Sequence, residues 1–450
     1  MKKFMIGAAT AAFAASSFAA GFGIYEASSR GNAVGGTLVA DTFEVDATAN
    51  YYNPANAAFA TNIQVAVGFT AINPYADVDV NSKSQDRMNS GWFTVPTFFF
   101  TVPLPGNFAF GWGNYTEYGL GTRYGKHWDL AGDTQKTTMR QITLSPTLSY
   151  KIMERWSVAA GLRASWLQFG NHKCPNQGDP YYYATPYGTL AAQDAYHLRS
   201  KLKGDDWAMG WMAGTTFKAT EDLSLSAVYR SQIKHNVRGH FDLAGDVSGT
   251  LDGMLAVPGM GTLPAAALLG DKVNFSQDIR EHGRASAKLR LPRSLTFGAN
   301  YRATEKWRLG ASITWTEWAS VKNINFKLPN GRSYTQQLHW NDVWRFGFGT
   351  EYDVLDWLTL RCGYTYDMDP SAKNHGTTML PSGDRHIIGT GLGFKISENL
   401  RLDLGYSFIR MNNDDRFIKL TGSDGVERKY KFSSRNGTSH LVSATVRYSF

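Results

Sequence analysis

The chain has 450 residues with a formal net charge of +8, and 14% of its residues are aromatic. The basic balance is compatible with anionic partners such as lipopolysaccharide, but no nucleic-acid-binding motif accompanies it, so we expect no nucleic acid partner. The two cysteines and ten histidines have no metal-ligand spacing, and we expect neither a metal nor a cofactor.

The first residues have the pattern of a secretory signal peptide. Lys2 and Lys3 precede a short apolar run that ends in small residues. We expect cleavage after Ala19, with Ala20 as the alternative, so the signal peptide covers residues 1–19. The apolar run is too short for a membrane-spanning helix, and no later stretch offers the roughly 20 apolar residues that such a helix needs.

Residues 20–60 show neither the alternation of a strand nor a long helical stripe. The segment is rich in small residues and contains the turn signal Asn53-Pro54-Ala55. Pro54 should end a local helix, and the Asn53 side chain should satisfy backbone groups that no neighbouring strand reaches. We expect residues 20–60 to fold compactly as a plug, or hatch.

From residue 61 onward, apolar and polar residues alternate with the period of a β-strand. Trp and Tyr recur at the ends of the apolar strand faces, as in the girdles of outer-membrane barrels. A secreted β-sandwich or β-propeller, the alternative, gives no reason for that placement. About 14 strands are predicted near residues 61–71, 91–102, 107–119, 137–151, 155–168, 206–218, 222–238, 284–303, 306–320, 341–353, 357–367, 383–396, 399–411 and 437–450.

The predicted fold class is therefore all-β: a transmembrane antiparallel β-barrel over residues 61–450, with the N-terminal hatch in its lumen. Such a barrel crosses the bacterial outer membrane many times. The face opposite the apolar one carries mid-strand arginines: Arg163, Arg230, Arg308, Arg345, Arg361, Arg401 and Arg447. On the lipid side each would cost roughly 2–4 kcal/mol near the midplane, so we expect them in the lumen. A structural charge network and a path for a carboxylate both explain them.

Two long segments, near residues 169–205 and 239–283, should form extracellular loops. The first contains PYGTLAAQDAYHLRSKLK, for which we expect a short helix. The second contains LDGMLAVPGMGTLPAAALLG, which is strongly apolar for an exposed loop. It favours capture of a hydrophobic substrate, although packing of the two loops on each other as a lid explains it equally. Cys174 in the first loop and Cys362 in a strand are expected to be unpaired.

Several motifs resemble those of one known family. They are AGFGIYEASSRGNAVGG followed by NPANAAF, GDDWAMGWMAGTTF, LPRSLTFGANYR, WTEWASV and WNDVWRFGFGTEY, in that order. The chain resembles the FadL family of outer-membrane long-chain fatty acid transporters, which includes aromatic-hydrocarbon uptake channels. The resemblance implies a hatch-closed barrel of 14 strands, a hydrophobic groove between the two long loops, and a deeper pocket at the mature N-terminus.

The resemblance also implies roles for single residues. Phe22 matches the N-terminal residue at the end of the pocket, and Lys173 and Gln336 match positions that hold the ligand carboxylate. The kinked third strand of the family, which opens a lateral exit, corresponds to residues 114–124. Tyr118, Gly119 and Gly121 are the candidate gating residues there, with Asn53, Pro54 and Ala55 expected to contact residues 114–121 and couple an occupied pocket to the exit.

The predicted function is passive, ligand-gated uptake of hydrophobic molecules, foremost long-chain fatty acids, with lateral release at the third strand. Because Gln336 is neutral, uptake of neutral or aromatic hydrocarbons is an alternative, and a non-specific porin is another. An enzyme is not expected, since adjacent Ser439 and His440 cannot face one side of a strand. We expect a monomer that contacts a hydrophobic ligand, outer-membrane lipid and lipopolysaccharide.

Overall fold

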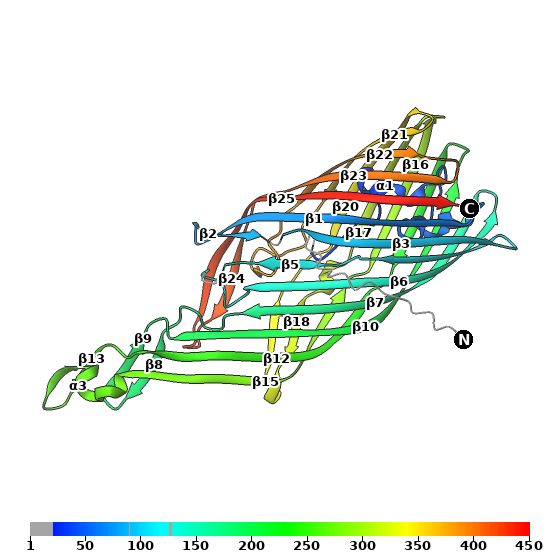
Figure 1. Ribbon diagram of the computed structural model, residues 1–450. Helices are drawn as coiled ribbons and strands as arrows, with labels where there is room; N and C mark the ends of the chain where they lie inside the picture. Colours follow the sequence, from blue (N-terminus) through cyan, green and yellow to red (C-terminus); the bar gives the residue numbers. More distant parts are fainter. Residues whose placement is uncertain (1–20, 90, 126–127) are drawn as a thin grey trace.

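The computed structural model describes residues 21–89, 91–125 and 128–450, so the predicted signal peptide lies outside the described residues. The fold is a closed antiparallel β-barrel of 14 strand positions, as predicted (Figure 1). Strand β1 (Gln64–Val80) pairs with β3 (Phe93–Leu104) on one side and with β25 (Glu427–Ser449) on the other, and this closes the sheet. A closed sheet leaves no unpaired edge in the membrane. Among the described residues, no helix has the length and apolar character needed to span a membrane.

Each predicted strand position coincides with an observed one, and several positions are divided into two strands. The undivided positions after β3 are β6 (Lys136–Met153), β7 (Trp156–Lys173), β10 (Tyr196–Lys218), β20 (Val343–Leu355), β21 (Leu358–Asp367), β22 (Arg385–Lys395) and β23 (Leu400–Met411). The divided positions are β4 (Phe108–Tyr115) with β5 (Leu120–Arg123), β11 (Leu223–Arg230) with β12 (Ile233–Thr250), β15 (Asn274–Leu291) with β16 (Ser294–Thr304), and β17 (Trp307–Thr316) with β18 (Asn323–Lys327).

The two faces of the strands differ as the alternation predicts. In β25, Leu441, Ser443 and Thr445 are buried, whereas Val442 and Val446 are exposed on the outer surface. The outer surface also carries exposed aromatic side chains at or next to strand ends, including Trp156, Phe217, Trp307, Trp357 and Tyr448. An outer surface that is apolar and bordered by aromatic residues is the surface that a bilayer requires.

The two ends of the barrel are unequal. Short turns join strands at one end, and the long segments extend from the other, which in outer-membrane barrels is the extracellular end. There β8 (Tyr181–Thr185) and β9 (Gly188–Ala192) form a hairpin, as do β13 (Met254–Val257) and β14 (Gly261–Pro264), followed by α3 (Ala265–Leu269) and η3 (Gly270–Val273). Together with the ends of β10, β12 and β15 they form an outer arm, residues 177–200 and 243–279, opposite the C-terminus (Figure 1).

Two expectations about this end were wrong. The helix expected in residues 186–203 is absent, because β9 and β10 occupy that stretch. The two long loops are also largely strands, since β10 begins at Tyr196 and pairs with β12 from Tyr196↔Val247 onward. Pairing with a distant strand outweighs a weak local helical preference. The two segments pack on each other through an apolar cluster that contains Leu190, Leu198, Leu251 and Leu255.

Additional hairpins complete the extracellular end. β2 (Lys83–Asn89) pairs with β1, and β24 (Asp414–Thr421) pairs with β25. β19 (Ser333–Gln337) pairs with β18, and short turns η4 (Trp318–Ser320) and η5 (Pro329–Gly331) flank β18. Cys174 is buried, Cys362 is exposed, and both thiols are free, as expected.

Residues 21–60, here called the N-terminal segment, lie inside the ring of strands (Figure 1). The segment contains α1 (Ser29–Ala33), η1 (Leu38–Ala40), α2 (Ala49–Tyr52) and η2 (Pro54–Phe59), and nearly all of its residues are buried. Its elements contact strands around the barrel: α1 touches β21, β22, β23 and β25, η1 touches β11 and β16, and η2 touches β6, β7 and β10. A Cβ on Gly363 would lie 2.4 Å from the backbone of Val34, so β21 needs a glycine where α1 approaches.

Candidate functional site

An open groove lies at the extracellular end of the barrel. It is bounded by the ends of β7, β10 and β12 and by the β18–β19 and β24–β25 hairpins. Its volume is about 800 Å³, within the 300–1,000 Å³ range of ligand pockets. The apolar residues that line it include Leu202, Phe241, Leu243, Phe326, Leu328 and Leu420. The apolar stretch 251–270, which the sequence favoured for substrate capture, lies at the end of the outer arm, and the described lining of the groove contains none of it.

One wall of this outer groove brings together two residues predicted to bind the ligand. The Lys173 ammonium lies 4.4 Å from the centre of the Tyr334 ring and donates to its hydroxyl at 3.3 Å. The Tyr334 hydroxyl in turn donates to the Gln336 side-chain oxygen at 2.5 Å. Burial raises the pKa of Tyr334, so this phenol is neutral at physiological pH and acts as a hydrogen-bond donor.

The basic side chains that line the groove differ in their partners. Arg332 pairs with Glu281, Lys419 with Glu427 at 2.7 Å, and Arg428 with Asp424 at 2.5 Å. In the part of the chain that the structure describes, Lys173 is the lining cation that has no carboxylate within 4.0 Å. A cation with a neutral partner is available to an incoming carboxylate.

A continuous cluster of buried apolar side chains connects the groove to the inside of the barrel. Leu202, Phe241 and Phe326 belong both to the groove lining and to this cluster. The cluster continues through Phe169, Leu167, Met139, Ile233, Val237, Leu289, Leu338, Val343 and Met379, and it ends at Phe22, Tyr118, Trp318 and Trp340. We call it the apolar column.

Phe22 lies at the inner end of the apolar column and is 1% exposed. Its ring centre lies 4.9 Å from that of Trp340 and 6.0 Å from that of Trp318. The preceding Gly21 has φ +62°, and a Cβ there would lie 2.6 Å from the Trp318 ring. Glycine therefore permits both the left-handed backbone and the close ring contact at this position.

The third barrel strand is interrupted next to Phe22. β4 pairs with β3 up to Asn114↔Phe98, whereas β1 pairs with β3 as far as Phe93. After residues 116–119, β5 pairs with β6. The first residues of β3, 93–97, are therefore not paired with β5 in the described chain.

The N-terminal segment takes the place of the missing strand partner. The Ile24 amide donates to the Glu117 carbonyl oxygen at 2.7 Å, and the Gly119 amide donates to the Phe22 carbonyl oxygen at 2.9 Å. Gly23 and Tyr118 form an antiparallel bridge. Gly121 lies in β5, opposite Thr138. The backbone at the interruption is therefore closed by residues 22–24.

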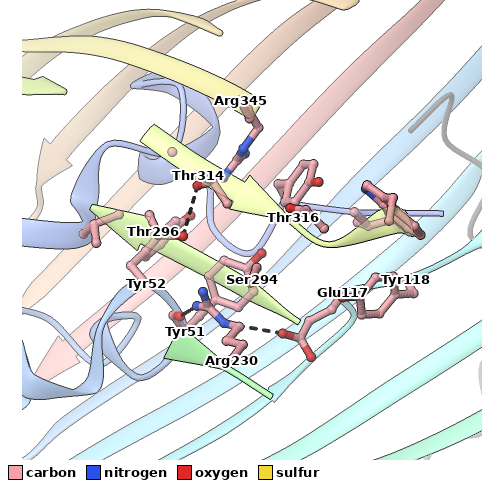
Figure 2. Close-up of a pocket in the computed structure, with 15 residues that line it drawn as sticks. Tyr51, Tyr52, Glu117, Tyr118, Arg230, Ser294, Thr296, Thr314, Thr316 and Arg345 are labelled. Carbon is pink, nitrogen blue, oxygen red and sulfur yellow. Dashed lines mark hydrogen bonds and ion pairs between the residues drawn. The ribbon is translucent and has the colours of Figure 1, made fainter. Parts of the chain in front are cut away.

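A second, much smaller cavity of about 50 Å³ lies beneath the interruption, between the N-terminal segment and the barrel wall (Figure 2). Tyr51, Tyr52, Tyr118 and Glu117 point toward it together with Arg230 and Arg345. The Arg230 guanidinium donates to the Tyr51 carbonyl oxygen and lies 3.5 Å from Glu117. The cavity has room for only a few water molecules, so a larger ligand enters only if the N-terminal segment moves.

The seven predicted arginines fall into separate groups inside the barrel. Arg163 pairs with Glu117 at 2.6 Å, next to Arg230. Arg345 lies 3.8 Å from the centre of the Tyr25 ring. The other four, Arg308, Arg361, Arg401 and Arg447, belong to a network with Arg30, Asp41, Glu44, Asp46, Glu351 and Asp403.

Glu44 is at the centre of that network. Its carboxylate contacts Arg308 at 2.8 Å, Arg401 at 3.0 Å and Arg447 at 2.8 Å. Burial by itself raises the pKa of Glu44, but Arg30 and these three arginines hold it well below the usual range. The arginines from the barrel wall therefore anchor the N-terminal segment through its own acidic residues.

The η2 helix lies next to β4, but no hydrogen bond is found between residues 53–55 and residues 114–121 among the described residues, so the expected coupling stays a prediction. The Asn53 side chain instead donates to Thr216 at 2.8 Å and to the Val39 carbonyl oxygen, and it accepts from the Ala55 amide at 3.0 Å. The Ala55 carbonyl oxygen accepts from Ser157, and Pro54 begins η2 directly after α2. Asn53 thus satisfies backbone groups, but on β10 rather than at the interruption.

Several residues of the site were not singled out from the sequence. They are Glu117, Tyr334, Trp318, Trp340 and Tyr51. Of these residues, Glu117 is the one that the sequence could have pointed to. It is an acidic residue between the two halves of an interrupted strand, and such a residue needs a buried basic partner. Tyr51 contacts Tyr115 with ring centres 5.0 Å apart, so the N-terminal segment reaches residue 115 two positions before Asn53.

The family model for "Outer membrane protein transport protein (OMPP1/FadL/TodX)" matches residues 10–450. The chain belongs to this family. It is therefore an outer-membrane transport protein for hydrophobic compounds.

The matches to individual relatives have low sequence identity but cover 90% or more of both chains. A "Long-chain fatty acid transport protein" of Escherichia coli O6:H1 is 24% identical over 473 residues, covering 100% of this chain and 98% of that protein. A "47 kDa outer membrane protein" of Pasteurella multocida is 26% identical, covering 90% of this chain and 91% of that protein.

Solved structures of relatives share the fold. A Pseudomonas aeruginosa FadL homologue has a TM-score of 0.74 at 22% identity, covering 96% of this chain and 100% of its own. The Pseudomonas putida toluene transporter TodX has a TM-score of 0.68 at 19% identity, covering 95% and 99%. At these identities the likeness supports the barrel fold and not the ligand.

Proposed function

We propose that the protein takes up long-chain fatty acids passively across the outer membrane and releases them sideways at the interrupted third strand. The observation that carries the proposal is the apolar column, which runs from an 800 Å³ groove to Phe22, the residue next to the interruption. Transfer of an alkyl chain along such a path is favoured by about 25 cal/mol for each Å² of apolar surface buried.

The first step is capture in the outer groove. The alkyl chain lies on Leu202, Phe241 and Phe326, and the carboxylate meets Lys173. The Tyr334 hydroxyl, which now donates to Gln336, is a second donor for the same carboxylate. A neutral hydrocarbon has no charge to pair with Lys173, and this favours the fatty acid over the aromatic-hydrocarbon alternative.

The second step is displacement of the N-terminus. A chain that advances along the apolar column reaches Phe22 and competes for its contacts with Trp318 and Trp340. Moving Phe22 removes the two backbone hydrogen bonds that close residues 117–119. The 50 Å³ cavity then joins the column, and the ligand has a way out between β3 and β5 into the bilayer.

A non-specific porin is disfavoured by the same features. The N-terminal segment is buried inside the ring of strands, and the cavity beside it has room for little more than water. An aqueous pore would need that space to be free.

The decisive experiment is a reversible lock between the N-terminus and the interruption. Gly23→Cys with Tyr118→Cys, in a background with Cys174→Ser and Cys362→Ser, places two thiols at a bridge. Bridge partners in antiparallel strands have Cα atoms about 4.5–5.5 Å apart, a spacing that suits a disulfide. We expect oxidised cells to lose oleate uptake and to regain it after reduction.

A matched control places the same kind of lock in the outer arm, with Tyr182→Cys and Ala191→Cys at another antiparallel pair. Uptake in this control should be the same in the oxidised and reduced states. Full uptake by the Gly23–Tyr118 lock, with the disulfide verified by mass spectrometry, would refute the gating step.

A second experiment addresses the substrate class. Lys173→Gln should lower the uptake of oleate about tenfold and leave the uptake of toluene unchanged, because only oleate has a carboxylate. Lys419→Gln is the control, since Lys419 lines the same groove but is already paired. Equal loss with both substrates would remove Lys173 as the carboxylate ligand.

A further inference from the structure

Five neighbouring strands, β6, β7, β10, β12 and β15, share an outward face that becomes rich in charged residues just beyond a pair of tryptophans. Trp166 of β7 and Trp207 of β10 are cross-strand partners, and Trp207 is 58% exposed. Side chains at alternate positions farther along these strands share the same outward face. Toward the barrel centre this face continues as Met209 and Trp211, both exposed. The tryptophan pair therefore marks the outer boundary of the lipid-facing band.

Three cross-strand rows follow beyond this boundary toward the extracellular end. The first row joins Arg140, Gln168, Asp205 and Arg238; the second contains Lys203, His240 and Arg284; the third joins Lys136, His172, Lys201, Asp242 and His282. Residues two apart on a strand are separated by about 7 Å, so the rows extend about 20 Å from the tryptophans along the strands. This is the depth at which outer-leaflet headgroups lie.

The rows carry six lysine and arginine side chains, which we call the outer basic face: Lys136, Arg140, Lys201, Lys203, Arg238 and Arg284. Among the described residues, none of the six has a carboxylate within ion-pair distance. The acids on the same face are engaged elsewhere: Asp242 contacts His282 at 2.5 Å, and Asp205 accepts from the Trp166 indole at 3.4 Å.

On the other side of the barrel several charges at a similar height form ion pairs, although Lys83 and Lys429 have no carboxylate within ion-pair distance among the described residues. Around β1, β2, β24 and β25, Arg87 pairs with Asp77 at 3.3 Å. Arg435 and Lys431 both pair with Asp415, at 2.5 Å and 2.9 Å. The six cations of the outer basic face, by contrast, lie in adjoining cross-strand rows directly above the lipid-facing surface.

We propose that the outer basic face binds the phosphate groups of lipid A, the anchor of lipopolysaccharide in the outer leaflet. The acyl chains would lie on the surface around Trp207, Met209 and Trp211, and the phosphates would meet the lysines and arginines above it. A phosphorylated lipid is the occupant because the cationic rows continue without a break from the lipid-facing band. The proposal concerns the outer wall, so it does not depend on the ligand that passes through the lumen.

The test uses the full-length purified barrel in detergent and measures binding of diphosphoryl lipid A. The variant is Lys201→Gln, Lys203→Gln, Arg238→Gln and Arg284→Gln. Each cation near an anionic lipid surface changes binding about fivefold, so four substitutions should weaken binding by more than about a hundredfold. The matched control, Arg87→Gln, Lys431→Gln and Arg435→Gln, removes paired cations and should bind as the unaltered protein does.

Two further measurements on the unaltered protein keep the test independent of any folding defect in the variant. Dephosphorylated lipid A should bind at least tenfold more weakly than the diphosphoryl form, and salt should weaken binding of the diphosphoryl form because it screens exposed charges. Equal binding of both forms would overturn the proposal. Equal affinity for phosphatidylglycerol micelles would also overturn it, since the surface would then select any anionic lipid.

Discussion

The N-terminal segment has two parts that are held in the barrel by different forces. Residues 21–24, the tip, are held by aromatic contacts of Phe22 and by two backbone hydrogen bonds to residues 117–119. Residues 28–59, the body, are held by buried ion pairs and side-chain hydrogen bonds, with Arg30 alone contacting Asp41, Glu351 and Asp46. An apolar ligand competes directly with the contacts of the tip, and it offers nothing that replaces the ion pairs of the body.

The two parts of the N-terminal segment therefore differ in how easily they can be displaced. Breaking a buried ion pair leaves an uncompensated charge, so the body resists displacement. Apolar contacts are interchangeable, because a Trp318 ring packs on an alkyl chain as well as on Phe22. Substitutions that act on only one of the two parts distinguish them, and the largest effect is expected in the body.

Arg30→Ala should release the body. The substitution leaves Asp41 without an ion-pair partner and removes one of the two arginine partners of both Glu351 and Asp46, and removing one member of a buried pair costs about 3–5 kcal/mol. We expect the N-terminal segment to become sensitive to protease and the barrel to conduct ions in planar bilayers. Arg401→Ala is the control, because that side chain is 39% exposed and makes a single ion pair. A closed, protease-resistant Arg30→Ala barrel would contradict the anchoring role.

Phe22→Ala should loosen the tip and leave the body in place. Truncating a buried Phe costs about 3 kcal/mol or more, here in contacts with Trp318 and Trp340. Hydrogen exchange of the Ile24 and Gly119 amides should accelerate, while exchange in α1 remains slow. Ion conductance should stay low. Rapid exchange in α1 would show that tip and body move as one unit.

Asn53→Ala should have a smaller effect, confined to the body. It removes the hydrogen bonds to Thr216, to the Val39 carbonyl oxygen and from the Ala55 amide. Leaving buried groups unsatisfied costs about 1–3 kcal/mol. The melting temperature should fall while oleate uptake by the assembled barrel is retained. Loss of oleate uptake at an unchanged melting temperature would instead support a gating role for Asn53.

The smallest effect is expected from pH. Because its pKa is held well below the usual range, Glu44 stabilises the docked body at any pH above the unfolded-state value of about 4.3. That contribution is lost only as the pH falls below this value toward the lowered pKa. Protease resistance of the body should therefore be constant from pH 7 to pH 5, and Glu44→Gln should remove part of the loss seen at lower pH.

The alternation of inward and outward side chains in the barrel depends on residues that are close together in the sequence. Alternation along β25 assigned Leu441 and Ser443 to the lumen and Val442 and Val446 to the lipid, and the closed ring follows that assignment. Mid-strand arginines such as Arg361 and Arg447 are buried in the lumen, because each strand has only two faces. The prediction failed for residues 186–203, where the local preference was weak and pairing of β10 with β12 decided the structure.

The class of fold, the number of strand positions and the side chains that face inward could be predicted from the chain alone, since these depend on neighbours two residues apart. The contacts between the parts of the N-terminal segment and the strands could not be predicted in this way and are set by the folded barrel. It placed Asn53 on β10, brought residues 22–24 to the interruption at residues 117–119, and set Glu117 between Arg163 and Arg230. Such contacts join residues far apart in the chain, so they exist only when the ring of strands is closed around the segment.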